Sequence, residues 1–281
     1  MYEVIFLWAL ALVYIIFAVI QDFKTREIAN WLTFSLIIFA LGFRLFYSMF
    51  SNDGFQFLFS GLIGLGIFFV LGNLLYYVKF FAGGDAKLMI SLGTILPIFP
   101  ILSSNIQSFF DFFLIFLIAG FLYILGSSIY FGIKNFKQFK KEFARQLKKN
   151  KRLMFAVLSL SIIMEILGFL QPIFFIVGIL IFFTSNLFLY TKSVDEACMV
   201  KKVKTKDLQE GDWLYSNVKI GKENIKAKWE GLSKKEIREL RKKVLQTKIR
   251  QGIPFCLVFL ISFVVFVLMN IFNIRLWNPF W

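Results

Sequence analysis

The chain alternates long apolar runs with short polar connections. A helix of about 20 residues is needed to cross the hydrocarbon core of a bilayer. Eight runs approach or reach that length, at residues 3–21, 31–50, 57–80, 86–102, 108–132, 153–169, 172–190 and 253–273. The pattern predicts an all-α polytopic membrane protein with about eight transmembrane helices.

Two features of this pattern can be interpreted in more than one way: the break between the sixth and seventh runs, and the nature of the first run. The sequence "GFLQP" at 168–172 runs from Gly to Pro and is typical of a turn. It predicts two helices there, with one long kinked helix as the alternative. The first run starts with Glu3 and lacks both a basic leader and a small-residue cleavage site. We therefore expect a retained helix and not a removed signal peptide.

A polar stretch at 191–252 separates the last two apolar runs. Short β-like runs come first, and a helix follows whose start carries the capping-box residues Ser233 and Glu236. One face of that helix is apolar, formed by Ile237, Leu240 and Val244. We expect a transmembrane catalytic domain at 1–190, a small basic α+β cap at 191–252, and a final helix with a short outer tail at 253–281.

The basic residues sort the connections into two kinds. The segments 133–152 and 191–252 are rich in Lys and Arg. The connections without any Lys or Arg lie at 51–56, 103–107 and 170–171. Because basic loops stay in the cytoplasm, this alternation predicts a multi-pass cell-membrane protein with both termini outside. The cap is then cytoplasmic, and so are residues 21–30 and 79–87.

The net charge of +15 raises the question of a partner. A basic surface can bind nucleic acid, but no stacking platform or known motif accompanies this one. Anionic lipid headgroups are the better expectation, since the basic segments adjoin apolar runs. We expect anionic membrane lipids as partners and no nucleic acid.

The composition limits the kinds of catalytic site that the chain can form. The chain has no His and only two Cys, Cys198 and Cys256, far apart. These absences exclude His-based triads, and they give no support to a thiolate metal site or a disulfide framework. We expect neither a metal nor a cofactor, so catalysis would use carboxylates, hydroxyls or amines.

The acidic residues near the apolar runs divide by predicted side. Those on or near the outer side are Glu3, Asp53, Asp111 and Glu165. Asp22 closes the first run and Asp85 opens the fourth, both on the cytoplasmic side. Taken singly, Asp85 could be a helix N-cap after a Gly-Gly loop, and Asp22 an interfacial acid screened by neighbouring cations.

Together the two aspartates suggest a reaction. Two adjacent carboxylates cannot both stay ionised cheaply, so one keeps its proton. The ionised member can then activate a water while the protonated member polarises a carbonyl. This is aspartic-protease chemistry.

The stretches around the two aspartates resemble the motifs of one family. "DFKTREIAN" at 22–30 is similar to the D-x-K-x-x-x-I-P-N stretch of type IV prepilin peptidases, and "AGGDAK" at 82–87 to their G-x-G-D-x-K motif. These enzymes, which include the archaeal preflagellin peptidases, are intramembrane aspartyl proteases. The chain departs from the motifs at Ala29, where the family has Pro, and at Ala82, where it has the first Gly.

The resemblance implies a function and a site. The catalytic pair would be Asp22 and Asp85, and the motif-supporting positions would be Lys24, Asn30, Gly83, Gly84 and Lys87. The substrate would be a prepilin or preflagellin precursor, cut between its short basic leader and its apolar helix. Bacterial relatives also methylate the new terminus and carry paired CxxC motifs. This sequence contains none, so we expect peptidase activity without N-methyltransferase activity.

Three alternatives stay open. Lys87 and Ser91 are spaced i, i+4 and could form a Ser-Lys pair, although Ser91 can equally bond its own helix backbone. A proton- or cation-coupled transporter could use paired carboxylates, but both acids lie at one interface and no inverted repeat is evident. The third alternative is a non-enzymatic assembly platform, which does not explain why the two aspartates occur in these two motifs.

Overall fold

The computed structural model describes residues 2–51, 54–99, 102–220, 223–228, 230–272 and 274. The chain forms two compact units. The first unit consists of Met1–Ile124 and Ile253–Trp281, and the second unit consists of Leu125–Gly252. The expected domains at 1–190, 191–252 and 253–281 stay a prediction.

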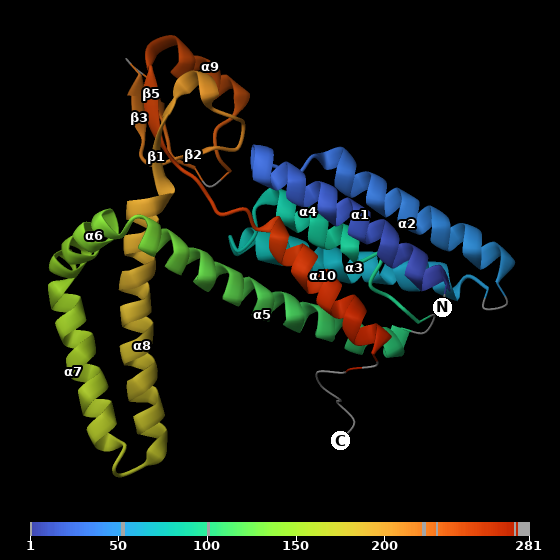
Figure 1. Ribbon diagram of the computed structural model, residues 1–281, viewed down its shortest axis with the longest axis horizontal. Coiled ribbons are helices and arrows are strands. Elements are labelled where there is room, and N and C mark those ends of the chain that lie inside the picture. The colour runs from blue at the N-terminus through green and yellow to red at the C-terminus, as the bar shows by residue number, and fades with distance from the viewer. Residues whose placement is uncertain are drawn as a thin grey trace. The chain divides into compact units, whose positions relative to one another are not determined.

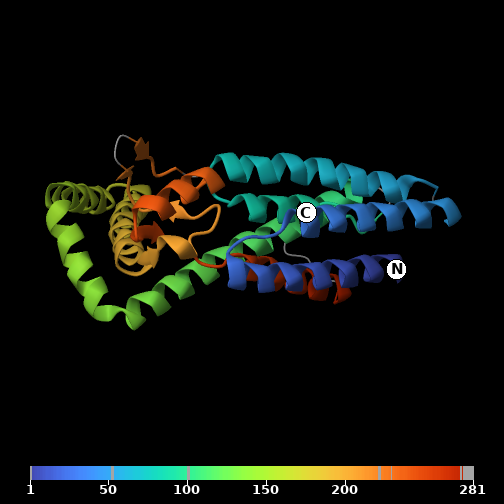
Figure 2. The ribbon, with the colours of Figure 1, turned by 90° about the horizontal axis from the view of Figure 1, so that it is seen from above.

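The first unit is a bundle of helices that run side by side (Figures 1 and 2). Its elements are α1 (Tyr2–Thr25), α2 (Asn30–Phe50), α3 (Gln56–Tyr77), α4 (Gly83–Leu92), the first part of α5 (Leu102–Lys134) and α10 (Cys256–Ile271). Helix α1 packs against α2 and α10, and α4 packs against α2 and α3. Aromatic rings fill the core, among them Phe81, Phe112, Phe116 and Phe259. Most of these rings meet edge-on or tilted, the arrangement that aromatic pairs prefer.

Small residues bring α3 and α4 together. A Cβ atom on Gly64 would collide with the carbonyl oxygen of Gly93, and one on Gly72 would come within 2.8 Å of Ile90. Small residues at helix contacts are typical of membrane bundles, because backbones must approach closely to gain van der Waals contact. The fourth helix is thereby held against the third along its length.

Arg44 lies fully buried in α2 and fixes the far end of α4. Its guanidinium donates hydrogen bonds to the carbonyls of Phe57, Thr94, Ile95 and Pro97 and to the Ser60 hydroxyl. The carbonyls of Thr94, Ile95 and Pro97 follow the end of α4, where helical partners are missing. One side chain therefore satisfies much of the backbone after this helix.

The second unit holds the end of α5, then α6 (Phe136–Lys149), α7 (Lys151–Leu167) and α8 (Pro172–Val194). Helices α7 and α8 pack together as a hairpin (Figure 1). The prediction of two helices separated at 168–171 is confirmed, with Pro172 in the first turn of α8, where a missing N–H costs nothing. The expectation of a loop at 133–152 is wrong, because this stretch is mostly helical. Its apolar residues Phe136, Phe139 and Phe143 recur at helical spacing among the cations.

The polar stretch of the second unit has the expected α+β character. A π-helical turn (Asp195–Met199) and a 3-10 turn (Thr205–Asp207) flank β1 (Val200–Lys204), which pairs antiparallel with β5 (Gln246–Arg250). β2 (Trp213–Leu214) pairs with the other edge of β5, and β3 (Val218–Ile220) forms a hairpin with β4 (Glu223–Ile225). Helix α9 (Lys234–Lys243) starts with the predicted capping box, and Ile237 and Leu240 are buried in a small core.

Length and composition qualify five of the described helices to cross a membrane: α1, α2, α3, α5 from Asn105, and α8 extended to Met199. Helix α10 is apolar but has only 16 residues. The expected eight spans are not confirmed. The run at 86–102 gives a helix that ends at Leu92, because Gly93 and a series of turns follow it. The run at 153–169 belongs to α7, which has 17 residues.

Candidate active site

Asp22 lies in the last turn of α1 and is buried. The inward face of this helix repeats at helical spacing, through Leu7, Ala11, Ile15, Ala18 and Asp22. The 3.6-residue period therefore carries the aspartate to the same side as the core residues. The helix ends just after it, where Arg26 adopts a φ of 60° and its N–H bonds the Asp22 carbonyl at 3.0 Å. A residue in this left-handed conformation is a common helix stop.

Asp85 is the third residue of α4. The cap position before the helix belongs to Ala82, so the interpretation of Asp85 as the N-cap is wrong. Asp85 is partly buried as a residue, whereas Asp22 is buried.

Cys256 joins the two aspartates. Its backbone N–H donates to Asp22 Oδ2 at 3.0 Å, and its Sγ lies 3.9 Å from Asp85 Oδ1. Cys256 is also the first residue of α10, so the partial positive charge of a helix N-terminus faces Asp22. The three helices α1, α4 and α10 thus bring two carboxyl groups to one residue.

The two motifs are also tied to each other. Lys87 Nζ donates to Asn30 Oδ1 at 2.6 Å, which links the start of α2 to the first turns of α4. Lys24 is different. It is exposed, and no hydrogen bond or ion pair to either aspartate is found within the described part of the chain.

At Gly84 the backbone of α4 lies close to Ile28, whereas the surroundings of Gly83 are open. A Cβ atom on Gly84 would lie 3.2 Å from two carbon atoms of Ile28, tighter than ordinary contact. On Gly83 it would meet only a Tyr76 ring carbon, at 3.9 Å. Ile28 belongs to the connection between Asp22 and Asn30. The second glycine is therefore what lets the two motifs pack together.

Comparison with known proteins shows a similarity to one family. Residues 8–127 match the family model described as the Type IV leader peptidase family. Preflagellin peptidases of three archaea are similar to the chain: that of Methanococcus maripaludis is 34% identical over 92 residues, that of Methanococcus voltae 30% over 99 residues, and that of Methanocaldococcus jannaschii 31% over 83 residues.

The similarity covers only part of each protein. The three alignments take in 32%, 34% and 30% of this chain, and 39%, 42% and 35% of the respective relatives. The chain therefore spans about two fifths of the length of the curated relatives it matches. No solved structure matches it significantly. The matched segment contains both aspartates and Lys87, and it does not contain Cys256.

The two departures from the peptidase motifs fit the backbone. Ala29 has a φ of −64°, the value that Pro would impose, and its N–H donates to Gln21 Oε1 at 3.0 Å. A hydrogen bond thus holds the bend in place of a proline ring. Ala82 has a φ of −70° in extended backbone, a conformation open to any residue. Neither alanine strains the site.

The remaining candidates lie elsewhere or are otherwise occupied. Ser91 is buried and its hydroxyl donates to Leu88 O at 2.8 Å, as expected of a serine that bonds its own helix. Glu3 lies at the opposite end of α1 from Asp22, and Glu165 belongs to the second unit. Asp111 is buried in α5, and Asp53 lies outside the described residues. The Ser-Lys alternative loses its support.

Cys256 is the residue that sequence reasoning missed. Its partner Asp22 is 234 positions away, and the contact uses a backbone N–H that no side-chain motif reveals. One signal was present: Cys256 lies near the start of the last apolar run, on the side where both aspartates were predicted.

Proposed function

We propose that the chain is an aspartic endopeptidase that removes the short basic leader from preflagellin or type IV pilin precursors. The observation that carries the proposal is the shared neighbour of the two motif carboxyl groups, Cys256. The match of residues 8–127 to a leader peptidase family model supports a protease. Asp22 and Asp85 are the proposed catalytic pair.

The proposed chemistry follows from two carboxyl groups that share one proton. The ionised member takes a proton from water as the water attacks the scissile carbonyl, and the protonated member donates to the carbonyl oxygen. Because the pair titrates as a unit, the rate should have a bell-shaped pH profile that belongs to both residues together.

The motif-supporting residues would hold the two catalytic carboxyl groups in place. The Lys87–Asn30 bond holds the first turns of α4 to the start of α2, so the two carboxyl groups keep their separation. Gly84 keeps the connection at Ile28 close to α4. We assign Lys24, Gly83, Gly84, Asn30 and Lys87 no chemical step.

The proposed location is a cell membrane, with the pair on the cytoplasmic side. Several apolar helices and the basic flanking segments support it. A Cys placed at Gln171, in the α7–α8 turn, should react with an impermeant maleimide in intact cells. A Cys placed at Lys149, at the end of α6, should react only after the membrane is opened. The reverse pattern would place the pair outside.

A cleavage assay in detergent tests the function. The purified chain, without any membrane gradient, should cut a preflagellin precursor immediately after its basic leader, as N-terminal sequencing of the product would show. A coupled transporter would have no activity in this assay, so absence of any cleavage by folded protein would contradict the proposal. The expectation that no methyl group is added can be read from the mass of the same product.

A further inference from the structure

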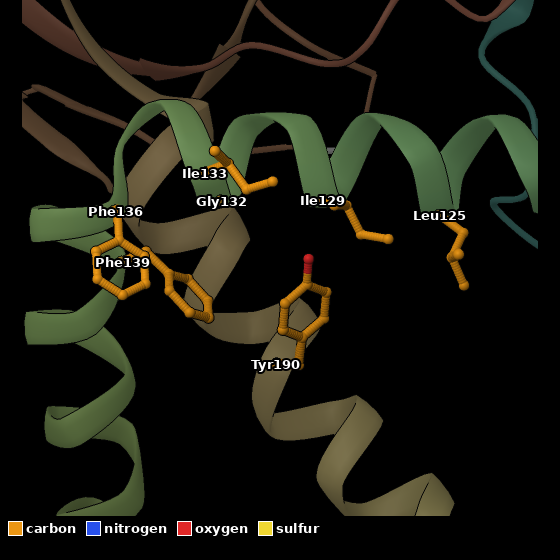
Figure 3. A pocket seen from close by; sticks show the side chains of 7 residues that line it. All are labelled: Leu125, Ile129, Gly132, Ile133, Phe136, Phe139 and Tyr190. Carbon is orange, nitrogen blue, oxygen red and sulfur yellow. The ribbon is translucent and has the colours of Figure 1, made fainter.

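The second unit contains an apolar pocket that the proposed peptidase reaction does not use (Figure 3). Its volume is about 400 Å³. It is lined by Leu125, Ile129, Gly132, Ile133, Phe136, Phe139 and Tyr190. The lining positions on α5 recur at helical spacing and span about 12 Å of the helix at 1.5 Å per residue, so the pocket has the form of a strip along the helix.

Tyr190 gives this strip one polar group. Its ring comes from α8 and its hydroxyl points toward α5 (Figure 3). A Cβ atom on Gly132 would lie 3.6 Å from that oxygen, so the glycine leaves room beside the hydroxyl. Within the described residues, the Tyr190 hydroxyl has no hydrogen-bond partner. A buried or half-buried hydroxyl ordinarily has one, so a ligand that accepts or donates a hydrogen bond fits this place.

Along the chain, a series of cations follows one end of the strip. Lys134 follows Ile133 at the end of α5, and Lys137 stands between Phe136 and Phe139 in α6. The remaining cations of α6 are Lys140, Lys141, Arg145, Lys148 and Lys149. The single acid of α6, Glu142, already contacts Arg145 and Gln146. The Lys134 Nζ lies over the Tyr130 ring, 5.6 Å from its centroid, and no ion pair of Lys134 or Lys137 is found in the part of the chain that the structure describes.

We propose that this pocket binds one anionic phospholipid. An acyl chain would lie along Leu125, Ile129 and Ile133, an oxygen of the glycerol region would meet the Tyr190 hydroxyl, and the phosphate would face Lys134 and Lys137. Charge complementarity selects this occupant: an apolar strip with a cationic end matches an amphiphile with an anionic head. A basic leader peptide carries the wrong charge for this end.

Retention of lipid by the purified full-length chain tests the proposal. The protein is exchanged into neutral detergent with equal amounts of phosphatidylglycerol and phosphatidylcholine, and bound lipid is counted by native mass spectrometry. We expect one retained phosphatidylglycerol per chain. Gly132→Leu, which fills the strip, should lower its retention about tenfold, since burial of the ligand surface is what such pockets provide. Gly126→Leu, on the same helix but outside the pocket, should retain it like the parent.

The charged end has its own control. Lys134→Gln together with Lys137→Gln should reduce the preference for phosphatidylglycerol over phosphatidylcholine about tenfold, as two cations near a headgroup would. Lys234→Gln together with Lys235→Gln, in α9, removes the same charge elsewhere and should not. Tyr190→Phe should weaken retention while the preference stays.

Several outcomes would overturn the proposal. Equal retention of both lipids by the parent protein would mean a nonspecific apolar surface. Undiminished retention by Gly132→Leu would place the lipid elsewhere, and an equal loss in the α9 variant would mean general attraction to a basic protein. A chain that retains no lipid and instead measures as a dimer that Gly132→Leu dissociates would assign the strip to a second copy. If a variant fails to fold, Ile129→Trp fills the same strip without changing the backbone.

Discussion

The two units use their polar groups in opposite ways. In the first unit three polar side chains contact specific partners: Arg44 bonds carbonyls, Asp22 accepts from the Cys256 N–H, and Lys87 donates to Asn30. In the second unit most cations project outward from α6 and the cap. The family match at 8–127 falls almost wholly in the first unit. We therefore expect function in the first unit to depend on individual contacts, and in the second on the distribution of charge.

Arg44 should show the largest contrast between the units. Arg44→Met leaves several buried carbonyls without donors, and each unsatisfied buried group costs about 1–3 kcal/mol. We expect the first unit to lose several kcal/mol of stability, seen as a large drop in the melting temperature in detergent. Arg145→Met removes an exposed arginine whose salt bridge within the described residues is to Glu142 in the same helix. It should change the melting temperature little, and equal losses in the two variants would contradict the comparison.

Cys256 should separate the backbone contact from the side chain. Cys256→Ala keeps the backbone N–H that donates to Asp22, so the rate of cleavage should fall by no more than about threefold. A methylthio group added to the thiol by methyl methanethiosulfonate would be forced between Sγ and Asp85 Oδ1, now 3.9 Å apart, and should abolish cleavage.

The matched control is Cys198, which lies in the second unit. Cys198→Ala should stay sensitive to the reagent, and Cys256→Ala should be resistant. Inactivation that survives Cys256→Ala would place the sensitive group outside the proposed site.

The two adjacent glycines offer a finer test within the first unit. Gly84→Ala pushes a methyl group against Ile28 at 3.2 Å, which moves the connection between Asp22 and α2. We expect about a tenfold loss of kcat/KM, since a small misplacement of a catalytic group is costly. Gly83→Ala meets nothing closer than 3.9 Å and should cleave nearly like the parent. The opposite ranking would refute the packing argument.

The capping box of α9 should give the smallest effect and leave cleavage unchanged. The backbone N–H of Ser233, bonded to the Glu236 carboxylate, holds the pKa of Glu236 below its ordinary value. The hydrogen bond therefore stabilises the folded cap at any pH above the Glu236 pKa in the unfolded chain, about 4.3. This stabilisation is lost as the pH falls through the lower pKa of the folded state. Ser233→Ala should cost about 1 kcal/mol in unfolding of the cap.

The pH dependence provides the check. Glu236→Gln should remove the part of the acid-induced loss of cap stability that Glu236 causes. Thermal unfolding between about pH 6 and pH 3, a range on both sides of the ordinary Glu pKa of about 4.3, measures this loss. An unchanged acid slope would show that other carboxyl groups of the cap determine it.

Much of the first unit follows from helical periodicity. The spacing that buries Leu7, Ala11 and Ile15 also buries Asp22, so the inward aspartate could be predicted from the sequence. The capping box and the break before Pro172 were local signals as well. The lengths of α4 and α7 were not predictable from hydropathy alone, because an apolar run continues through Gly93 and into turns.

The contacts that the sequence did not reveal are those made to backbone groups. Arg44 bonds carbonyls about 50 positions away, and Cys256 reaches Asp22 through its own N–H. Neither has a motif, since any residue could supply the carbonyl or the N–H. The helix α6 was missed for a different reason: its many cations suggested a loop, although its Phe positions already had helical spacing.

The central claim is that Asp22 and Asp85 act as one catalytic unit, and the most direct measurement is the cleavage rate of Asp22→Asn, Asp85→Asn and the double variant. Asparagine keeps the shape but cannot share a titrating proton. Each single change should lower kcat at least about 1,000-fold, and the double change should be no worse than either, because effects within a unit are not additive. Glu165→Gln, in the second unit, should cleave normally. A folded Asp85→Asn variant that cuts a preflagellin at a near-normal rate would contradict the account.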